Sequence, residues 1–342
     1  MMKTMPAIVL AEPGRFELIE QPALVMAGPG EVLVRVHRIG VCGTDLHAFA
    51  GRQPFFTYPR ILGHELGVEV VEAGPGANAK KGERGCIEPY LNDPSSAASR
   101  AGKGNCCENL RVLGVHIDGG MRPLINVPAN KLHVSQKLDY DQLALVETLC
   151  IGAHGVERAA IDKGETVLVN GAGPIGLGAI QFALARGARM AVADVSARRL
   201  AFVRERLGIQ HTIEASSGDF ESKLRDAFGG NLPAAVIDAT GNLGSMERCF
   251  NLAAHGGRIV FLGLTREKIS FDNPNFHKRE LTLLASRNAL PGTFGEVIAR
   301  VERGEIDTTP WITHRMELME VPELFAPTAA DSTLVKAMIS VG

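Results

Sequence analysis

The sequence predicts an α/β protein with two domains, and three features lead to this prediction. Its 342 residues, of which 45% are hydrophobic, exceed the length at which one hydrophobic core keeps growing. Residues 5–40 alternate short β-rich runs with Pro-Gly turns, which is typical of an antiparallel, barrel-like module. After Glu165 the pattern changes to apolar strands that alternate with helices, which predicts a doubly wound parallel sheet.

In the first part of the chain, strand candidates lie at 7–11, 31–40 and 67–73. Segment 91–107 is rich in Ser, Ala and Gly, and its composition predicts a solvated loop. Residues 139–160 then carry apolar side chains at helical spacing. We expect this helix to join the two domains.

The second part of the chain has longer apolar runs, as expected for strands that are buried on both faces. Its strand candidates lie at 166–170, 188–194, 234–240, 257–264 and 281–286, with helical stretches such as 198–208 between them. A further helix is expected at 294–305, and a last strand at 334–340.

Charge and composition exclude several classes of function. The net charge is −2, with acids and bases interspersed, so the chain lacks the basic patch of a nucleic-acid binder. No apolar run is long enough for a membrane span, and the N-terminal segment breaks at Pro13-Gly14 before a signal-peptide core is complete. Six cysteines without an even spacing are typical of reduced thiols. We therefore expect a cytoplasmic protein that binds a small molecule.

A glycine motif follows the strand at 166–170. Its residues are Gly171, Ala172, Gly173, Pro174, Ile175 and Gly176. In a strand–turn–helix context this motif predicts a dinucleotide site, because the glycines allow a tight turn and a close approach to a pyrophosphate. Asp194, about twenty residues further on, can bind the ribose hydroxyls and would repel a 2′-phosphate, which favours NAD over NADP. Arg198 and Arg199 weaken this preference, since a guanidinium could hold that phosphate.

The stretch from Gly40 to Gly67 contains side chains that bind metals. Cys42, His64 and Glu65 offer sulfur, nitrogen and oxygen to one ion, the mixed donor set that zinc accepts. Taken alone, Cys42 is more often a small core residue and His64 a hydrogen-bonded one. Together they predict a catalytic zinc site with an open position.

The motifs GVCGTDLH and YPRILGHE, at 40–47 and 58–65, resemble those of the zinc-containing medium-chain dehydrogenases. The resemblance covers the whole chain and is strongest to the sorbitol and threonine dehydrogenase branch. Within this branch three longer segments look like the sugar-acid dehydrogenases that oxidise the 5-hydroxyl of L-galactonate. These segments read GRQPFFTYPRILGHE, NCCENLRVLGVHIDGG and FHKRELTLLASRNA.

This resemblance implies a domain organisation and a set of functional residues. A GroES-like catalytic domain would span 1–150 and be completed by 288–342, and a Rossmann domain would span 151–287. Glu147 would lie close to the zinc and bind it directly or through water. Thr44 would contact the substrate hydroxyl, and His47 would pass its proton outward. Thr44-Asp45 can equally be read as the cap of the helix that follows.

The family would also place further residues near the cofactor, although on their own they read as strand ends. These are Arg199, Thr240, Gly263, Leu264, Arg287 and Asn288. Two groups are candidates for the substrate pocket. Its walls would be Phe55, Phe56 and Tyr58, and a substrate carboxylate would be held by Arg60, Arg122 or Arg287.

One part of the family pattern is missing. The family carries a second, structural zinc on four cysteines spaced C-x2-C-x2-C-x7-C. Here Asp93, Ser96 and Ser99 stand at the first three positions, and only Cys107 matches the pattern. A single thiol cannot form a closed tetrahedral site, so we expect one catalytic zinc and no structural zinc.

The sequence thus predicts a zinc- and NAD-dependent dehydrogenase that oxidises a secondary alcohol of a polyol or sugar acid to a ketone. The family implies a homodimer or homotetramer. Threonine is the alternative substrate. Other readings are a zinc-free enone or quinone reductase that uses NADPH and a non-catalytic binding protein. Cys42, His64 and Glu65 speak against the reductase.

Overall fold

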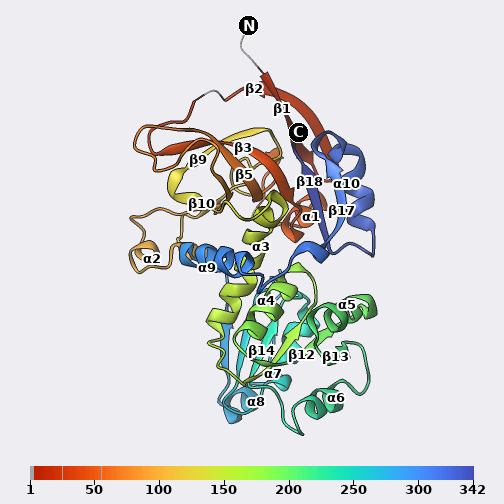
Figure 1. Cartoon of the computed structure of the whole chain (residues 1–342). Coiled ribbons are helices and arrows are strands. Elements are labelled where there is room, and N and C mark those ends of the chain that lie inside the picture. The colour runs from red at the N-terminus through yellow and green to blue at the C-terminus, as the bar shows by residue number, and fades with distance from the viewer. Residues whose placement is uncertain (1–3, 25, 55) are drawn as a thin grey trace. The chain divides into compact units, whose positions relative to one another are not determined.

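The computed structural model describes residues 4–24, 26–54 and 56–342, and the chain divides into two compact units. Unit 1 consists of Met1–Glu147 and Leu290–Gly342, and unit 2 of Thr148–Ala289. Each unit is described by itself (Figure 1). Within the described ranges, no helix has both the length and the apolar character needed to cross a membrane.

The main sheet of unit 1 is built around β3 (Glu31–Gly40). This strand pairs antiparallel with β5 (Glu65–Ala73), β9 (Leu124–Pro128) and β18 (Lys336–Ser340). The outer strands are β6 (Arg84–Ile87), β10 (Leu132–Val134) and β17 (Ile312–Glu317). Of these, β17 pairs parallel with β18. The chain's last strand is therefore inserted between β3 and β17.

Two smaller sheets complete the strands of unit 1. One consists of β2 (Arg15–Pro22), β1 (Thr4–Glu12) and β4 (Arg60–Ile61), and the other of β7 (Tyr90–Leu91) and β8 (Arg111–Val112). Its helices are α1 (Gly43–Phe49), α2 (Ala97–Arg100), α9 (Pro291–Glu302), α10 (Val321–Ala330) and the first part of α3 (Tyr140–Arg158), with short 3-10 turns η1 (Gly104–Cys106), η2 (Ala129–Lys131), η3 (Thr309–Trp311) and η4 (Leu318–Glu320).

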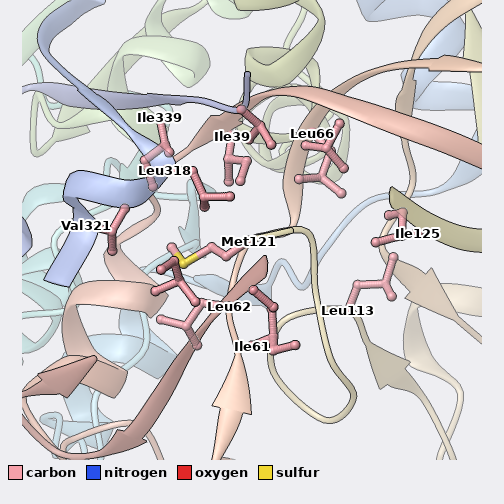
Figure 2. Packing of buried hydrophobic residues seen from close by; sticks show 14 of the residues in the cluster. Ile39, Ile61, Leu62, Leu66, Leu113, Met121, Ile125, Leu318, Val321 and Ile339 are labelled. Atoms are coloured by element: carbon pink, nitrogen blue, oxygen red, sulfur yellow. The ribbon is translucent and has the colours of Figure 1, made fainter. Parts of the chain in front are cut away.

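The core of unit 1 forms where the strands carry β-branched and aliphatic side chains. Ile39 of β3 pairs with Leu66 of β5 on one side and with Ile339 of β18 on the other. Figure 2 shows these three side chains in one cluster with Met121, and all four are buried. Gly40 directly follows Ile39, and Glu65 directly precedes Leu66. The packing of Ile39 and Leu66 therefore also holds the backbone of Gly40 and Glu65 in place.

Segment 91–107 is mostly irregular, as its composition predicted, but two short helical elements interrupt it. It contains α2 and η1, and Cys107 at its end is buried. The Ser96 hydroxyl caps α2 by accepting a hydrogen bond from the Ser99 amide, 3.1 Å away. A serine at a helix N-cap is favourable for this reason, and it explains how a short helix forms in a polar stretch.

Unit 2 contains the predicted parallel sheet. Its six strands have the order β13-β12-β11-β14-β15-β16, and every pairing is parallel. The strands are β11 (Thr166–Asn170), β12 (Arg189–Asp194), β13 (His211–Glu214), β14 (Ala235–Asp238), β15 (Arg258–Phe261) and β16 (Thr282–Ala285). The helices between them are α4 (Pro174–Ala185), α5 (Ala197–Leu207), α6 (Phe220–Ala227), α7 (Leu243–Leu252) and α8 (Asn273–Lys278). The α/β fold class is therefore confirmed.

Candidate metal centre and cofactor site

The ends of two paired strands bring the three predicted metal ligands together. Cys42 lies two residues after the end of β3, His64 directly precedes β5 and Glu65 is its first residue, and the register pairs Gly40 with Glu65. One ligand atom each of Cys42, His64 and Glu65 lies within 4.8 Å of the others. His64 and Glu65 are buried and Cys42 is half-buried. This arrangement matches the donor set expected for zinc.

A glycine opposite Glu65 makes room for its carboxylate. A Cβ atom added to Gly40 would collide with Oε2 of Glu65. Any larger residue at position 40 would therefore displace this carboxylate. The glycine at this position serves the site through the space it leaves, since its φ is not in the left-handed region.

Asp45 connects two of the candidate ligands. Its Oδ2 accepts a hydrogen bond from the Cys42 amide, 2.8 Å away, and its Oδ1 lies 3.7 Å from His64 Nδ1. The N-cap position is Cys42 and α1 begins at Gly43, so the helix starts earlier than the sequence suggested. Asp45 nevertheless takes part in the cap, because its carboxylate in the first turn accepts from the Cys42 amide and forms a capping box.

Lys336 is a contact of Glu65 that the sequence analysis missed. Its Nζ lies 2.6 Å from Glu65 Oε1 and also forms an ion pair with Oε2. Lys336 and Glu65 are 2% and 0% exposed. Burial alone would lower the pKa of Lys336, but the negative groups around it, with Glu65 first among them, together outweigh this effect and raise the pKa. The available signal was a lysine within the apolar run of β18.

Glu147 lies on α3 and is buried, but it is not one of the three residues whose ligand atoms lie within 4.8 Å of one another. Its Oε1 accepts a short hydrogen bond from the Tyr90 hydroxyl. Burial raises the pKa of Glu147, and the nearby His64 opposes this shift. The apolar neighbours in its helix predicted its burial, but nothing in the sequence pointed to Tyr90.

The charges around these residues fit a cation. Asp45, Glu65 and Glu147 are buried carboxylates, and Lys336 is the ammonium group placed among them. Burial alone would lower the pKa of His64, but the negative charge of Asp45 and Cys42 raises it well above its usual value. A site with this excess of negative charge is stabilised by a divalent ion, and Cys42, His64 and Glu65 are the side chains that would hold it.

Thr44 and His47 lie on α1, three positions apart and therefore on neighbouring surfaces of the helix. Thr44 is half-buried, whereas His47 is more exposed. Partial burial, together with the Arg52 guanidinium, lowers the pKa of His47. A neutral imidazole near the surface can accept a proton, but the relay role stays a prediction.

The candidate residues of the substrate pocket have contacts of their own. Phe56 and Tyr58 form an edge-to-face ring pair with centroids 4.8 Å apart, while Phe55 lies outside the described residues. Arg60 Nη1 donates to Asp118 Oδ1 over 3.1 Å, and Arg122 Nε donates to the Gly119 carbonyl over 3.1 Å. Both guanidinium groups are thus already engaged within unit 1. A substrate carboxylate would have to compete with these partners.

The glycine motif of unit 2 forms the predicted turn between β11 and α4. Gly171 has φ +92°, a conformation that favours glycine. A Cβ atom on Gly176 would collide with the Gly171 carbonyl oxygen, so the helix start can approach the turn only without a side chain there. Gly173 caps α4, and Pro174 and Ile175 form its first turn. The free amides of this helix start are suited to a phosphate.

Asp194 ends β12 beside this turn. Its Oδ2 accepts a hydrogen bond from the Ala172 amide over 2.7 Å, and its Oδ1 accepts one from the Ser196 amide over 2.8 Å. The Arg199 guanidinium lies 3.9 Å from Oδ2. The carboxylate is buried and fixed against the glycine turn, where a ribose would lie in a dinucleotide site.

The other predicted cofactor residues follow the ends of neighbouring strands. They are Thr240 after β14, Gly263 and Leu264 after β15, and Arg287 and Asn288 after β16. All these strands are parallel, so their carboxyl ends share one edge of the sheet with Gly171 and Asp194. Thr240 donates its hydroxyl to Asp238 over 2.7 Å, and a Cβ atom on Gly263 would collide with the Gly241 amide. Their cofactor contacts stay predictions.

Comparison with known proteins yields two family models and several close relatives. Residues 28–137 match the alcohol dehydrogenase GroES-like domain, and residues 174–303 match the zinc-binding dehydrogenase model. The L-galactonate-5-dehydrogenase of Escherichia coli strain K12 is 41% identical over 342 residues, covering 99% of this chain and 100% of that protein.

Solved structures are similar over the full length. A zinc-binding dehydrogenase from Sinorhizobium meliloti 1021 bound to NADP has 30% identity and a TM-score of 0.92, covering 99% of both chains. RspB from Escherichia coli CFT073, in complex with NADH, has 28% identity and a TM-score of 0.91, covering 98% of this chain and 99% of that chain.

These likenesses confirm the family resemblance, the GroES-like domain and the predicted class of enzyme, a zinc-type dehydrogenase that acts on alcohol groups with a nicotinamide cofactor. They rest on two family models and on a relative that matches along the whole chain. The chain therefore belongs to the zinc-binding medium-chain dehydrogenases.

Proposed function

We propose that this enzyme oxidises a secondary hydroxyl of a sugar acid or polyol to a ketone and transfers the hydride to NAD. The observation that carries the proposal is the cluster of Cys42, His64 and Glu65, whose sulfur, nitrogen and oxygen donors lie within 4.8 Å of one another. This donor set suits a zinc ion that keeps one position open for a substrate oxygen.

The residues around the cluster supply the remaining chemistry. A bound zinc would act as a Lewis acid and make the substrate hydroxyl more acidic near neutral pH. Cys42, His64 and Glu65 would hold the ion, and Oδ1 of Asp45 lies 3.7 Å from Nδ1 of His64. The Thr44 hydroxyl accepts the proton of the substrate hydroxyl and passes its own proton on, because a hydroxyl can donate and accept at once. His47, with its lowered pKa, accepts that proton and passes it to solvent.

Asp194 supports the choice of NAD. Its two oxygens accept from the Ala172 and Ser196 amides, which fixes the negative charge beside the glycine turn. A 2′-phosphate would be repelled there, whereas ribose hydroxyls can still donate to the free lone pairs. The similar structures were described with NADH in one case and NADP in the other, so the cofactor depends on this chain's own residues.

The likeness to an L-galactonate-5-dehydrogenase at 41% identity supports a six-carbon aldonate as the substrate. An identity at this level supports the class of compound rather than the individual sugar acid. Binding of its carboxylate requires a cationic group, for which Arg60 and Arg122 would exchange their contacts with Asp118 and Gly119.

The test is the formation of NADH, followed by absorbance, with metal-quantified protein and a panel of aldonates, polyols and threonine. We expect turnover on an aldonate with NAD, little turnover with NADP, and loss of activity when a chelator removes about one zinc per chain. Turnover on threonine alone would replace the substrate class. Protein that contains no zinc and reduces an enone with NADPH would overturn the proposed function.

A further inference from the structure

Tyr90 contacts the carboxylate that lies beside the candidate metal site. Its hydroxyl donates to Oε1 of Glu147, which is 57 residues away in the sequence. Tyr90 and Glu147 are 3% and 4% exposed, so water does not compete for this bond. A hydrogen bond from a neutral donor to a buried carboxylate is strong and directional.

The ring of Tyr90 is held by packing that does not involve its hydroxyl. It lies edge-to-face against Phe294 of α9, with centroids 6.2 Å apart. Phe294 in turn stacks on His133 at 4.7 Å, and His133 Nε2 lies 3.2 Å from Glu88 Oε2. Because these contacts fix the ring, removal of the hydroxyl leaves the packing intact. The hydroxyl therefore has a role separate from the core.

The backbone on both sides of Tyr90 is also fixed. Lys131 Nζ donates to Glu88 Oε1 over 2.5 Å and to Asn92 Oδ1 over 3.1 Å. One buried ammonium group thus holds the residues two positions before and two positions after Tyr90. The donor is presented to Glu147 from a rigid segment, as is required of a group that fixes the geometry of a site.

The other partner in this pair is Glu147. A glutamate side chain has several rotatable bonds, and this one interacts electrostatically with both His64 and Glu65. A carboxylate that changes rotamer there would alter the charge around the metal ligands. Outer partners of metal sites act by restricting such movement.

We propose that Tyr90 is a positioning residue of the dehydrogenase, whose hydroxyl holds Glu147 in one orientation beside Cys42, His64 and Glu65. The inference rests on the proposed function, because it assigns Glu147 to the metal centre. Tyr90 itself touches neither substrate nor cofactor in this role. It acts through Glu147, and its effect depends on that residue.

The test is a double-mutant cycle on zinc affinity, measured by competition with a chelator. Tyr90→Phe is expected to weaken zinc binding about tenfold, the lower end of the range for outer partners of metal sites, and to shift the absorption bands of the cobalt-substituted protein. Glu147→Gln is expected to weaken zinc binding as well. In the Glu147→Gln background, Tyr90→Phe should then change the affinity less than about twofold.

Tyr140→Phe is the matched control, because it also removes a hydroxyl that donates to a carboxylate of unit 1, Glu69 Oε2 at 2.9 Å. It should leave zinc affinity and the cobalt spectrum unchanged. An equal effect of Tyr90→Phe with and without Glu147, or an unchanged affinity and spectrum in Tyr90→Phe, would overturn the proposal. The same holds if Tyr140→Phe weakens zinc binding as much as Tyr90→Phe.

Because zinc binding is measured without substrate, the two proposals fail separately. A cycle that shows coupling, in a protein that oxidises no aldonate or polyol, keeps the role of Tyr90 and rejects the substrate class. Turnover of an aldonate in a protein whose cycle shows no coupling keeps the dehydrogenase and rejects the role of Tyr90. Circular dichroism of each variant shows that the fold is retained.

Discussion

The buried ammonium of Lys336 neutralises the charge of the Glu65 carboxylate. When zinc binds, we expect Glu65 to exchange its contact with Lys336 for the metal. Lys336→Met leaves this carboxylate buried without its cation, and breaking such a pair costs about 3–5 kcal/mol. The melting temperature of the metal-free protein should therefore fall by roughly 5–15 °C. Because zinc can replace the lost charge, the zinc-loaded variant should lose less.

Arg258→Met provides the control for this comparison. Arg258 likewise forms an ion pair with a carboxylate, Glu165, at 2.6 Å, but this pair belongs to unit 2 and contains no candidate zinc ligand. This variant should lose equal stability with and without zinc. Equal losses in both metal states of Lys336→Met, measured by scanning calorimetry, would show that Lys336 has no connection with the metal site.

A second prediction at the scale of single residues concerns Asp194. Asp194→Asn keeps an oxygen that can accept from the Ala172 amide and removes the charge that repels a 2′-phosphate. Arg198 and Arg199 remain to attract that phosphate. We expect the ratio of kcat/KM for NADP to that for NAD to rise at least about tenfold, or about 1.4 kcal/mol.

Steady-state kinetics with both cofactors on the same substrate provide this ratio. Arg199→Ala should change it in the opposite direction, because it removes a cation 3.9 Å from Asp194 Oδ2. An unchanged ratio in Asp194→Asn would assign the choice of cofactor to other residues.

Sequence reasoning identified the residues of the site whose spacing carries information. Cys42, His64 and Glu65 could be named because thiol, imidazole and carboxylate groups cluster between glycine-rich turns. Lys336 could not be named, since its partner is 271 residues away and only the strand order places them together. Tyr90 could not be named for the same reason, because nothing in the neighbouring sequence indicates which side chain its hydroxyl contacts.

At the scale of elements, the segment around α2 is held by short polar side chains. Asn92 Nδ2 donates to Ser99 Oγ over 2.9 Å, Ser96 Oγ donates to Ser99 Oγ over 3.0 Å, and the Asp93 amide donates to Cys107 Sγ over 3.3 Å. These bonds connect the positions at which the family would have four cysteines. We expect them to fix the segment without a metal.

Cys107→Ser tests this expectation. The variant should contain about one zinc per chain, as the unmutated protein should, because one thiol does not form a closed tetrahedral site. Elemental analysis of both purified proteins gives the ratio of metal to protein. About two zinc ions in the unmutated protein, falling to about one in Cys107→Ser, would contradict the expectation of a single catalytic zinc.

In unit 2, an ion pair connects the start of β11 with the start of β15. Arg258 donates from Nη1 to Glu165 Oε1 over 2.7 Å and from Nη2 to Oε2 over 2.6 Å. These hydrogen bonds from Arg258 lower the pKa of Glu165. A carboxylate with a lowered pKa stabilises the folded state above its unfolded value of about 4.3, and this contribution is lost as the pH falls through the folded value.

Glu165→Gln should therefore lower the free energy of unfolding by about 1–2 kcal/mol at pH 7. The difference from the unmutated protein should shrink below about pH 4, because protonated Glu165 resembles glutamine. Urea unfolding at pH 7 and at about pH 3.5 measures both values. A difference that is independent of pH would mean that the charge of Glu165 does not stabilise unit 2.

The elements themselves followed the sequence where hydrophobic periodicity was strong. The buried strands of unit 2 and the long helix α3 lie where continuous apolar runs and helical spacing predicted them. The element that the sequence analysis missed, α2, lies in a short polar segment. There one capping side chain, Ser96, decides the structure, and composition alone does not reveal it.

For the whole molecule, the candidate metal and cofactor residues fall into different compact units. Cys42, His64, Glu65 and Lys336 belong to unit 1, whereas the glycine turn belongs to unit 2. Zinc removal should therefore increase hydrogen exchange mainly in β3, β5 and β18. Addition of NAD at about 100 times its Kd should slow exchange mainly around β11 and α4 and stabilise the protein by about 2.7 kcal/mol.

Hydrogen exchange with mass spectrometry distinguishes these effects by peptide. Peptides from α6, which lies in unit 2 and contains none of the candidate cofactor residues, provide the reference. Equal acceleration of exchange in both units after chelation would mean that the metal stabilises the whole chain rather than unit 1.

The insertion of β18 between β3 and β17 has a consequence for biosynthesis. Lys336 emerges from the ribosome 271 residues after Glu65, so the nascent chain holds Cys42, His64 and Glu65 long before their buried counter-charge exists. Unit 2 is one continuous stretch of the chain. It can fold while the main sheet of unit 1 still lacks the strand that pairs with one side of β3. Metal capture by the finished centre is thus an event that follows translation of the final strand.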